Sequence, residues 1–523
     1  MMNKKNAIFV VTFFLGCLCT INFWVYSRLT VDDAFITWRY GKNLVDAGIW
    51  NYNPNFYDLT QAYTNPIIAI ISIIPAFIGI DTVFFFKAIS ILSVVIFCIW
   101  YLKESRGSWI PLLIILSIPA TVIHAFAGLE TFIYVLLVSV LIIELDKNSW
   151  GSSILCAVLL FMTRPESWLL VVIMPFYFSI HLKNLAEFKE NISIYSKLNI
   201  LAREFDLSLF FKTFCALALP LGAYLIVHKL YFGYALPNTY YVKSGGVFSM
   251  AVFMKFNFFL LPIFLLYFQN KYKLILFLII FFEGIIYNYS KSILLMDYSS
   301  RFIFHVFFPI YISMSIILTK KILPKFFSIN FSKLTSKITF NIILIGFLMV
   351  FIRGIGVRNI IPITYYPRAL DAHASFGKLL KNISHKYAIH TFMLGDAGMA
   401  AFHSGINAFD NAGLGSSKAA HNGISEKLLD NYGIDLIAYQ SRPDGIRLSD
   451  YNQDLVHRWA VSKNFQYICE VYFLDDYTLK LYSRRDIPEL YDLCLISKEK
   501  NDRPDIEYLR NIIFVPPWQY WRE

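Results

Sequence analysis

The chain has 523 residues, of which 57% are hydrophobic and only 16% are charged, and its mean hydropathy is +0.53. This balance excludes an ordinary soluble globular protein and is typical of a protein that uses lipid as its solvent. The formal net charge of +11 does not indicate a nucleic-acid partner, because most basic residues lie in short loops between apolar runs, as the positive-inside rule predicts.

The N-terminal segment carries Lys4 and Lys5 and continues into an apolar run of about twenty residues, which is long enough to cross a bilayer. No small-x-small cleavage site follows this run, so the pattern does not favour a removable signal peptide. We expect an uncleaved first helix with a cytoplasmic N-terminus.

Further apolar runs predict the rest of the membrane domain. The 66–80 run is short and contains Pro66 and Pro75, so we expect a re-entrant or surface helix that does not cross. Excluding it gives about eleven spans and puts the lysine-rich 320–337 loop on the cytoplasmic side, as the positive-inside rule favours. The remaining runs are 83–101, 109–125, 129–145, 151–162, 166–181, 209–229, 249–268, 273–289, 302–319 and 338–353.

The C-terminal segment has a different character. It has no spanning run, and stretches such as "YAIHTFMLGDAG", "IDLIAYQ" and "YTLKLYS" predict strands and Gly-rich turns. At about 170 residues it is long enough to bury a core of its own. We therefore expect a transmembrane domain over 1–353 and an extracytoplasmic α/β domain over 354–523. Cys469 and Cys494 could form a disulfide there if the compartment is oxidising.

Polar residues of the membrane half gather on the extracytoplasmic side of this topology. Ionisable residues at a membrane edge are costly, and their convergence on one side suggests a water-filled site. The polar residues that gather on this side are Asp32, Asp33, Arg39, Thr64 and Asn65 in the first external loop (28–65), and then Glu130, Arg164, Glu166, Asn238, Lys243, Asp297 and Arg301.

Several of these residues also have ordinary structural interpretations. Thr30 and Asp33 have the spacing of a capping box, and acids in a first turn favour the helix dipole. Asp32 and Arg39 would share one stripe of that helix. Lys243 could snorkel to the membrane interface.

Two ion pairs are further structural alternatives. Arg164 and Glu166 could pin a proline turn, and Asp297 and Arg301 have the i, i+4 spacing of a helix ion pair.

The motifs in chain order resemble the GT-C superfamily of membrane glycosyltransferases. The closest branch contains the bacterial arabinofuranosyltransferases that use polyprenyl-phosphate sugars. The matching stretches are "DDAFITWRYGKN" with "AYTNP", then "AGLET", "TRPES", "YFGYALPNTYYVK", "DYSSRF" and the C-terminal "GDAG…SG…NAGLG". The branch often has a longer Gly-rich run before Asp297, where this chain has "KSILLM".

This resemblance implies a GT-C fold and an enzyme of the bacterial inner membrane. The expected reaction is an inverting transfer of a hexosyl or pentosyl group, with arabinofuranose suggested by the nearest branch, from a polyprenyl-phosphate donor to an acceptor hydroxyl. The acceptor could be a cell-envelope glycan, a lipopolysaccharide or a protein. The family implies metal-independent or weakly metal-dependent chemistry. A divalent cation therefore stays open as a cofactor, although the six histidines of the C-terminal segment lack metal-ligand spacing.

The resemblance and the chemistry together assign roles to the polar residues. Asp33 matches the second Asp of the family's pair and is expected to be the base that takes the acceptor proton, with Asp32 orienting the acceptor or holding the helix. The donor phosphate needs cations, for which Arg39, Arg164, Lys243 and Arg301 are candidates. Thr64, Asn65, Glu130, Glu166, Asn238 and Asp297 are expected to support the substrates or the site.

Two alternative functions use similar residues. A transporter or flippase of lipid-linked sugars also needs an apolar groove and cations, but it predicts polar residues near the bilayer midplane. A glycan ligase or polymerase would show a long external loop between late spans, whereas here the first loop and the C-terminal segment are the long ones.

Overall fold

A computed structural model describes residues 4–523, with the exception of 56, 181–204, 244–245, 293, 295–296, 322–359, 397, 443–444, 447–451, 475–476, 502–509, 511–513 and 522–523. The expected span at 338–353, most of the predicted 320–337 cytoplasmic loop, and the expected domain boundary at 354 lie outside the described residues.

Six helical segments of the described chain are long and apolar enough to cross a membrane. A seventh is added if α6 (Trp109–Leu116) and α7 (Pro119–Phe126), which are bent by 71°, count as one span. Pro119 starts the second half of this pair, and its missing N–H explains why one continuous helix does not form. The six are α1 (Lys4–Tyr26), α5 (Thr82–Glu104), α13 (Leu207–Phe232), α15 (Met250–Asn257) continuing into η2 (Phe258–Gln269), α16 (Tyr272–Lys291) and η3 (Tyr298–Ser300) continuing into α17 (Arg301–Lys321).

The expected count of eleven spans is not confirmed. Three expected spans form α8 (Thr131–Asp146), α9 (Trp150–Phe161) and α10 (Leu170–Ser179), which have only 16, 12 and 10 residues. At a rise of 1.5 Å per residue even α8 reaches about 24 Å, against a hydrocarbon core of about 30 Å. The 66–80 run forms α3 (Pro66–Ile71) and α4 (Ile73–Ile78), each too short to cross, as expected.

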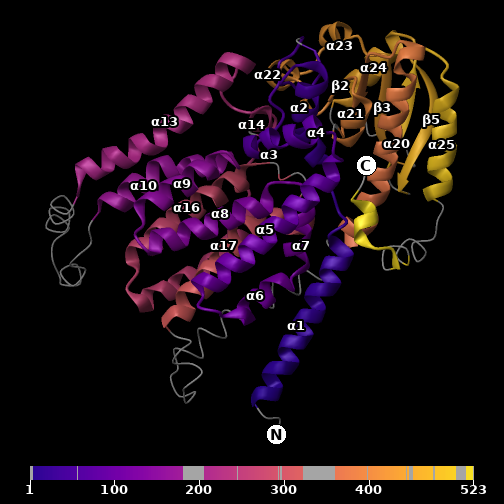
Figure 1. Ribbon diagram of the computed structural model, residues 1–523. Coiled ribbons are helices and arrows are strands. Elements are labelled where there is room, and N and C mark those ends of the chain that lie inside the picture. Colours follow the sequence, from indigo (N-terminus) through magenta and orange to yellow (C-terminus); the bar gives the residue numbers. More distant parts are fainter. Residues whose placement is uncertain are drawn as a thin grey trace.

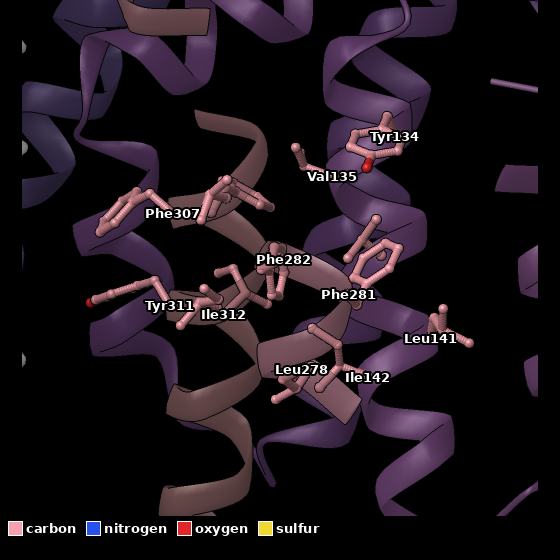
Figure 2. Close-up of a cluster of buried hydrophobic side chains, with 14 of the residues drawn as sticks. Tyr134, Val135, Leu141, Ile142, Leu278, Phe281, Phe282, Phe307, Tyr311 and Ile312 are labelled. Carbon is pink, nitrogen blue, oxygen red and sulfur yellow. The ribbon is translucent and has the colours of Figure 1, made fainter. Parts of the chain in front are cut away.

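Helix α17 lies at the centre of the membrane domain. All residues of its apolar, membrane-length stretch are buried, whereas only 11% of the residues in the corresponding stretches of α1 and α13 are buried. Figure 2 shows Phe307 and Ile312 of α17 with Phe282 of α16 and Tyr134 and Ile142 of α8 in one cluster of buried side chains. A helix surrounded by protein in this way holds its first residue, Arg301, in a fixed position.

The C-terminal part contains a mixed sheet with helices on both faces. The strand order is β2-β1-β3-β6-β5, with β4 paired to β3; β1 runs parallel to β2 and β3, and the other pairs are antiparallel. The strands are β1 (Thr391–Leu394), β2 (Asn407–Phe409), β3 (Leu436–Arg442), β4 (Gly445–Ile446), β5 (Gln466–Leu474) and β6 (Tyr477–Ser483). The three stretches expected to contain strands therefore form β1, β3 and β6.

Two apolar clusters join this sheet to its helices. One includes α20 (Ile360–Tyr387) and α25 (Pro488–Asn501), and the other includes α23 (Glu426–Tyr432) and α24 (Gln453–Ser462). The sulfurs of Cys469 on β5 and Cys494 on α25 are bonded as a disulfide, which attaches α25 to the sheet.

One face of the sheet shares its core with the membrane half, while the cluster on the α23 and α24 face consists of C-terminal residues alone. The α20 face of the sheet forms one cluster with Tyr40, Tyr52 and Tyr63 from the first loop region. The Asn53 side chain donates to Ala408 O (3.1 Å) and accepts from Ala408 N (2.9 Å), as a neighbouring strand would. Figure 1 accordingly shows α2 (Asp32–Ala47), α3, α4 and α14 (Asn238–Lys243) at the same end of the molecule as the sheet, with the N-terminus at the opposite end.

Asp58 anchors the first loop to the C-terminal part. Its Oδ2, on a side chain that is almost fully buried, accepts from Ser416 Oγ (2.6 Å), Tyr432 Oη (2.6 Å) and Lys418 N (3.2 Å). Because one buried oxygen accepts from three donors, this carboxylate holds the first loop firmly against the C-terminal part. Each donor would lose its acceptor if the carboxylate were removed.

We therefore expect Asp58→Ala to lower the unfolding free energy by about 2 kcal/mol, measured by thermal or chemical unfolding of the purified protein in detergent. Asp46→Ala is the matched control, since Asp46 is an exposed partner of Lys42. Equal stability of the two variants would contradict the anchoring role of Asp58.

Candidate active site

A cavity of about 400 Å³ lies where α2, α14 and the first turn of α17 meet. Its volume is in the range of small-molecule sites, about 300–1,000 Å³. It brings together residues that are up to 381 positions apart in the chain, from Asp33 to Leu414. Among the predicted site residues the lining includes Asp33, Thr64, Asn65, Glu130, Arg164, Glu166, Lys243 and Arg301.

The first turn of α2 differs from the expected capping box. The helix begins at Asp32, its N-cap is Val31 in an extended conformation, and no side chain caps it. The buried Thr30 hydroxyl has no hydrogen-bond partner among the described residues. The predicted Thr30–Asp33 box is therefore wrong, because Val31 N donates to Ala127 O (3.0 Å) and this contact holds the segment before α2 against another loop.

The contact between Val31 and Ala127 depends on a close approach of the backbone at Gly128 to helix α2. Gly128 follows Ala127 with φ +85°, and a Cβ there would lie 2.8 Å from the Trp38 ring and 3.0 Å from Ala34 Cβ. Glycine is the one residue that fits both the positive φ and this distance. The "AGLE" motif thus brings Glu130 close to α2.

Asp33 lies on the cavity side of α2, together with Ile36 and Thr37 one turn later. Among the described residues no group donates a hydrogen bond to its carboxylate, so its oxygens can accept from a ligand. Burial raises the pKa of Asp33; Lys243 and Arg301 oppose this effect, and Asp396 and Glu130 add to it. A carboxyl group in this environment can exchange a proton closer to neutral pH than an exposed aspartate.

Asp32 and Arg39 lie on another face of α2 and contact α21 (Met399–Ser404). Asp32 accepts from Gly398 N (2.9 Å) and Met399 N (2.7 Å) at the start of α21, and Arg39 Nη2 donates to Ile406 O (2.6 Å) just beyond its end. The negative charge of Asp32 therefore meets unpaired N–H groups at the start of this helix, and Arg39 binds the backbone just beyond its other end.

These contacts assign Asp32 and Arg39 to the junction with the C-terminal part. The two residues share a face, as their spacing predicts, but that face is turned away from the cavity, so Arg39 is not placed to hold a donor phosphate. Burial and the neighbouring Asp396 raise the pKa of Asp32 to about 8, although the two N–H donors lower it. Gly398 is required here, since a Cβ would meet Asp32 O at 2.0 Å.

Glu130 is the centre of a buried polar network. Its Oε1 accepts from Arg164 Nη1 (2.8 Å) and Arg301 Nη2 (2.9 Å), and its Oε2 accepts from Asn65 Nδ2 (2.6 Å). Arg164 also donates from Nη2 to Glu166 (2.7 Å), so the predicted Arg164–Glu166 pair is present within a larger network. The two arginines lower the pKa of Glu130 despite its burial, which keeps the group ionised.

Lys243 at the end of α14 is the cavity cation with the fewest protein partners. It forms no ion pair with the described residues, whereas Arg164 and Arg301 both bind Glu130. Burial lowers the pKa of Lys243, and Asp33 and Glu130 raise it. An anion in the cavity would therefore find Lys243 available for contact.

Besides Asp32 and Arg39, two more predicted residues, Asn238 and Asp297, lie outside the cavity lining. Asn238 Nδ2 donates to Leu414 O (3.2 Å) and its Oδ1 accepts from Ser417 Oγ (3.2 Å), so it joins α14 to the loop after β2. Asp297 Oδ1 accepts from Phe302 N (3.2 Å) at the start of α17. Arg301 contacts Glu130 and donates from Nε to Thr131 Oγ1 (3.1 Å), so its position is set mainly by the "AGLET" motif.

Sequence reasoning missed Lys87, a buried lysine within the α5 span. Its ammonium donates to Phe126 O (2.6 Å) and to Leu29 O. Leu29 lies four residues before Asp33, and Phe126 lies four residues before Glu130, so one cation joins the two segments that carry these carboxylates. A single lysine in an otherwise apolar span is the signal that could have revealed it, because a buried charge requires partners.

We expect Glu130→Gln to lower the unfolding free energy by about 3–5 kcal/mol, the cost of leaving buried cations without their counter-charge. The control is Glu144→Gln, whose surface pair with Lys147 contributes about 0–1 kcal/mol. Chemical unfolding in mixed micelles measures both. A Glu130 variant as stable as the control would show that the two arginines do not need this carboxylate.

Comparison with known proteins gives little at the level of sequence. No protein-family model matches the chain, and no curated protein matches it. Among solved structures, the chain is similar to the crystal structure of ArnT from Cupriavidus metallidurans bound to undecaprenyl phosphate, with 9% identity, a TM-score of 0.49, and coverage of 92% of this chain and 99% of that chain.

Proposed function

We propose that this chain is a membrane glycosyltransferase that moves a sugar from a polyprenyl-phosphate donor to an acceptor hydroxyl on the extracytoplasmic side. The observation that carries the proposal is the cavity in which the Asp33 carboxylate, open to a ligand, lies together with the cations Lys243, Arg164 and Arg301. A base for a hydroxyl and a cationic site for a phosphate are the two groups that such a transfer requires.

Lys243 is the proposed main contact of the donor phosphate. The guanidinium groups of Arg164 and Arg301 already form ion pairs with Glu130 and Glu166. The positive charges of the two arginines therefore have fixed positions in the proposed site. When the bond between the anomeric carbon and the phosphate oxygen breaks, the bonding pair stays on the phosphate, whose negative charge increases. Fixed cations stabilise that developing charge more than the charge of the bound donor, which lowers the barrier.

Asp33 is the proposed base. It takes the proton of the acceptor hydroxyl while the acceptor oxygen attacks the anomeric carbon from the side opposite the phosphate, so the configuration inverts in one displacement. The proton then leaves Asp33 for water. Asp32 acts as a positioning residue in this proposal, because its carboxylate holds the first turn of α2 against Gly398 and Met399.

The remaining details follow from the resemblance and the local chemistry. Apolar lining residues, among them Leu129, Trp168 and Phe302, suit the first isoprenoid units of the donor. We propose arabinofuranose as the first sugar to test, and an envelope glycan, a lipopolysaccharide or an exported protein as the acceptor. The Cys469–Cys494 disulfide supports an oxidising, extracytoplasmic location for the domain over 354–523 in a bacterial inner membrane.

The direct test supplies purified protein with radiolabelled polyprenyl-phosphate sugars and measures transfer. We expect Asp33→Asn to lower kcat about 100-fold or more, as for loss of a general base, and Asp32→Asn to lower it less. Asp46→Asn, on the exposed end of the same helix, is the control. Failure of the wild type to consume any donor, or an undiminished rate for Asp33→Asn, would overturn the proposal; movement of intact donor across the bilayer would favour a flippase.

The pH profile provides an independent test of the base. Lys243 is the strongest of the charges that lower the pKa of Asp33, so Lys243→Gln should raise that pKa further. Since the base must be ionised, the acidic limb of the kcat/KM profile should move to higher pH, and the KM for the donor should rise. Lys291→Gln is the control, because Lys291 lines the cavity but is not among the charges that act most on Asp33. An unmoved acidic limb in Lys243→Gln would exclude Asp33 as the titrating base.

A further inference from the structure

A second cavity, of about 280 Å³, lies between α1, α5 and the C-terminal helices α20 and α21. It does not include Asp33 or Lys243, and the proposed transfer does not use it. Its polar lining residues include Arg28, Thr30, Ser375, Lys378, His403 and Gln519. The volume is just below the about 300–1,000 Å³ of typical small-molecule sites, which suits a ligand of the size of a lipid headgroup.

This cavity lies at the edge of the membrane domain. Arg28 follows the end of α1 by two residues, and Val83, another lining residue, is the second residue of α5. Two candidate spans therefore end at its wall. Tyr520 lines the cavity, and the ring of Trp518, two residues earlier in the chain, lies 5.7 Å from that of Trp24, so aromatic residues of the kind found at a membrane interface occur in the segments at its wall.

The electrostatic environment of the cavity is positive. The Arg28 guanidinium is buried and lies 4.9 Å from the centroid of the Tyr520 ring, while Lys378 contributes an exposed ammonium at the rim. The lining also contains one carboxylate, Asp371. Burial, together with the positive charges of Lys378, Lys42 and Lys381, lowers the pKa of His403 to about 3, which keeps this imidazole neutral.

The cavity lining also contains a buried hydroxyl group, that of Thr30, which forms no hydrogen bond with the described residues. Thr30 is only 4% exposed, and its hydroxyl has no hydrogen-bond partner among the described residues. A buried hydroxyl without a partner costs free energy, and a bound ligand that accepts its hydrogen bond would remove this cost.

We propose that this second cavity binds a phosphate ester, with Arg28 and Lys378 as its cationic contacts and the Thr30 hydroxyl as a hydrogen-bond donor to a phosphate oxygen. Arginine and lysine near an apolar membrane edge match such an anion in charge and in donor geometry. The phosphate can come from the headgroup of an anionic phospholipid or from a soluble phosphate ester. The inference does not depend on the transferase activity.

The first arm of the test uses the full chain in nanodiscs that contain equal amounts of phosphatidylglycerol and phosphatidylcholine. Native mass spectrometry measures which lipid stays bound. We expect selective retention of phosphatidylglycerol by the wild type and a loss of about tenfold in affinity for Lys378→Gln and for Thr30→Val, the effect of one charge-assisted hydrogen bond. Lys427→Gln, an exposed lysine on α23, is the matched control for charge and should retain the lipid.

The second arm uses lipid-depleted protein in detergent with inorganic phosphate or glycerol 3-phosphate. A rise in the unfolding temperature that Lys378→Gln abolishes and Lys427→Gln does not would assign the site to soluble phosphate esters, while retention of phosphatidylglycerol alone would assign it to the membrane. Each result supports the proposal. Variants of normal unfolding temperature that bind both kinds of ligand as the wild type does, or a wild type that selects neither, would overturn it.

Discussion

The buried carboxylate of Glu130 is the interaction on which the polar end of the membrane domain depends. It bonds to Arg164, Arg301 and Asn65, which come from three other segments of the chain. Buried cations of this kind are tolerated only with a counter-charge and good hydrogen-bond geometry. The network therefore determines where the first turn of α17, the "TRPE" turn and the "TNP" segment can lie, and the cavity is the space that they enclose with α2 and α14.

Helix α2 gives each carboxylate of the Asp pair a different partner. A helix turns 100° per residue, so adjacent side chains must point in different directions. Asp33 points into the cavity, and Asp32 binds the N-terminal N–H groups of α21, with Arg39 two turns later at the other end of that helix. The adjacency of the two acids thus couples the cavity mechanically to the C-terminal part, because any displacement of α21 also displaces the helix that carries Asp33.

Much of the fold and of the candidate site could be predicted from the sequence, and each prediction that was wrong has a physical reason. Apolar length and alternation predicted the long helices and the principal strands, because burial in lipid or in a sheet core imposes those patterns. Of the twelve site residues that were predicted from clustering on one side of the membrane, eight line the cavity. Hydropathy could not distinguish a span from a short buried helix such as α9, since both are apolar. The capping box failed because a tertiary contact, Val31 with Ala127, replaced the local one, and Lys87 was overlooked because its partners are backbone carbonyls without a sequence signature.

The pairing of the first loop with the C-terminal part has a consequence for the order of biosynthesis. Asp32 bonds to residues 366 and 367 positions later, and Asn53 and Asp58 have partners at similar separations. The first loop therefore leaves the ribosome and reaches its side of the membrane long before the residues that complete its core exist. During this interval Asn53 and Asp58 lack their native partners in the C-terminal part, as in other chains whose long-range contacts form last. A ribosome that stops before residue 398 would leave Asp32, Asn53 and Asp58 without these partners, so the first loop completes its contacts only late in synthesis.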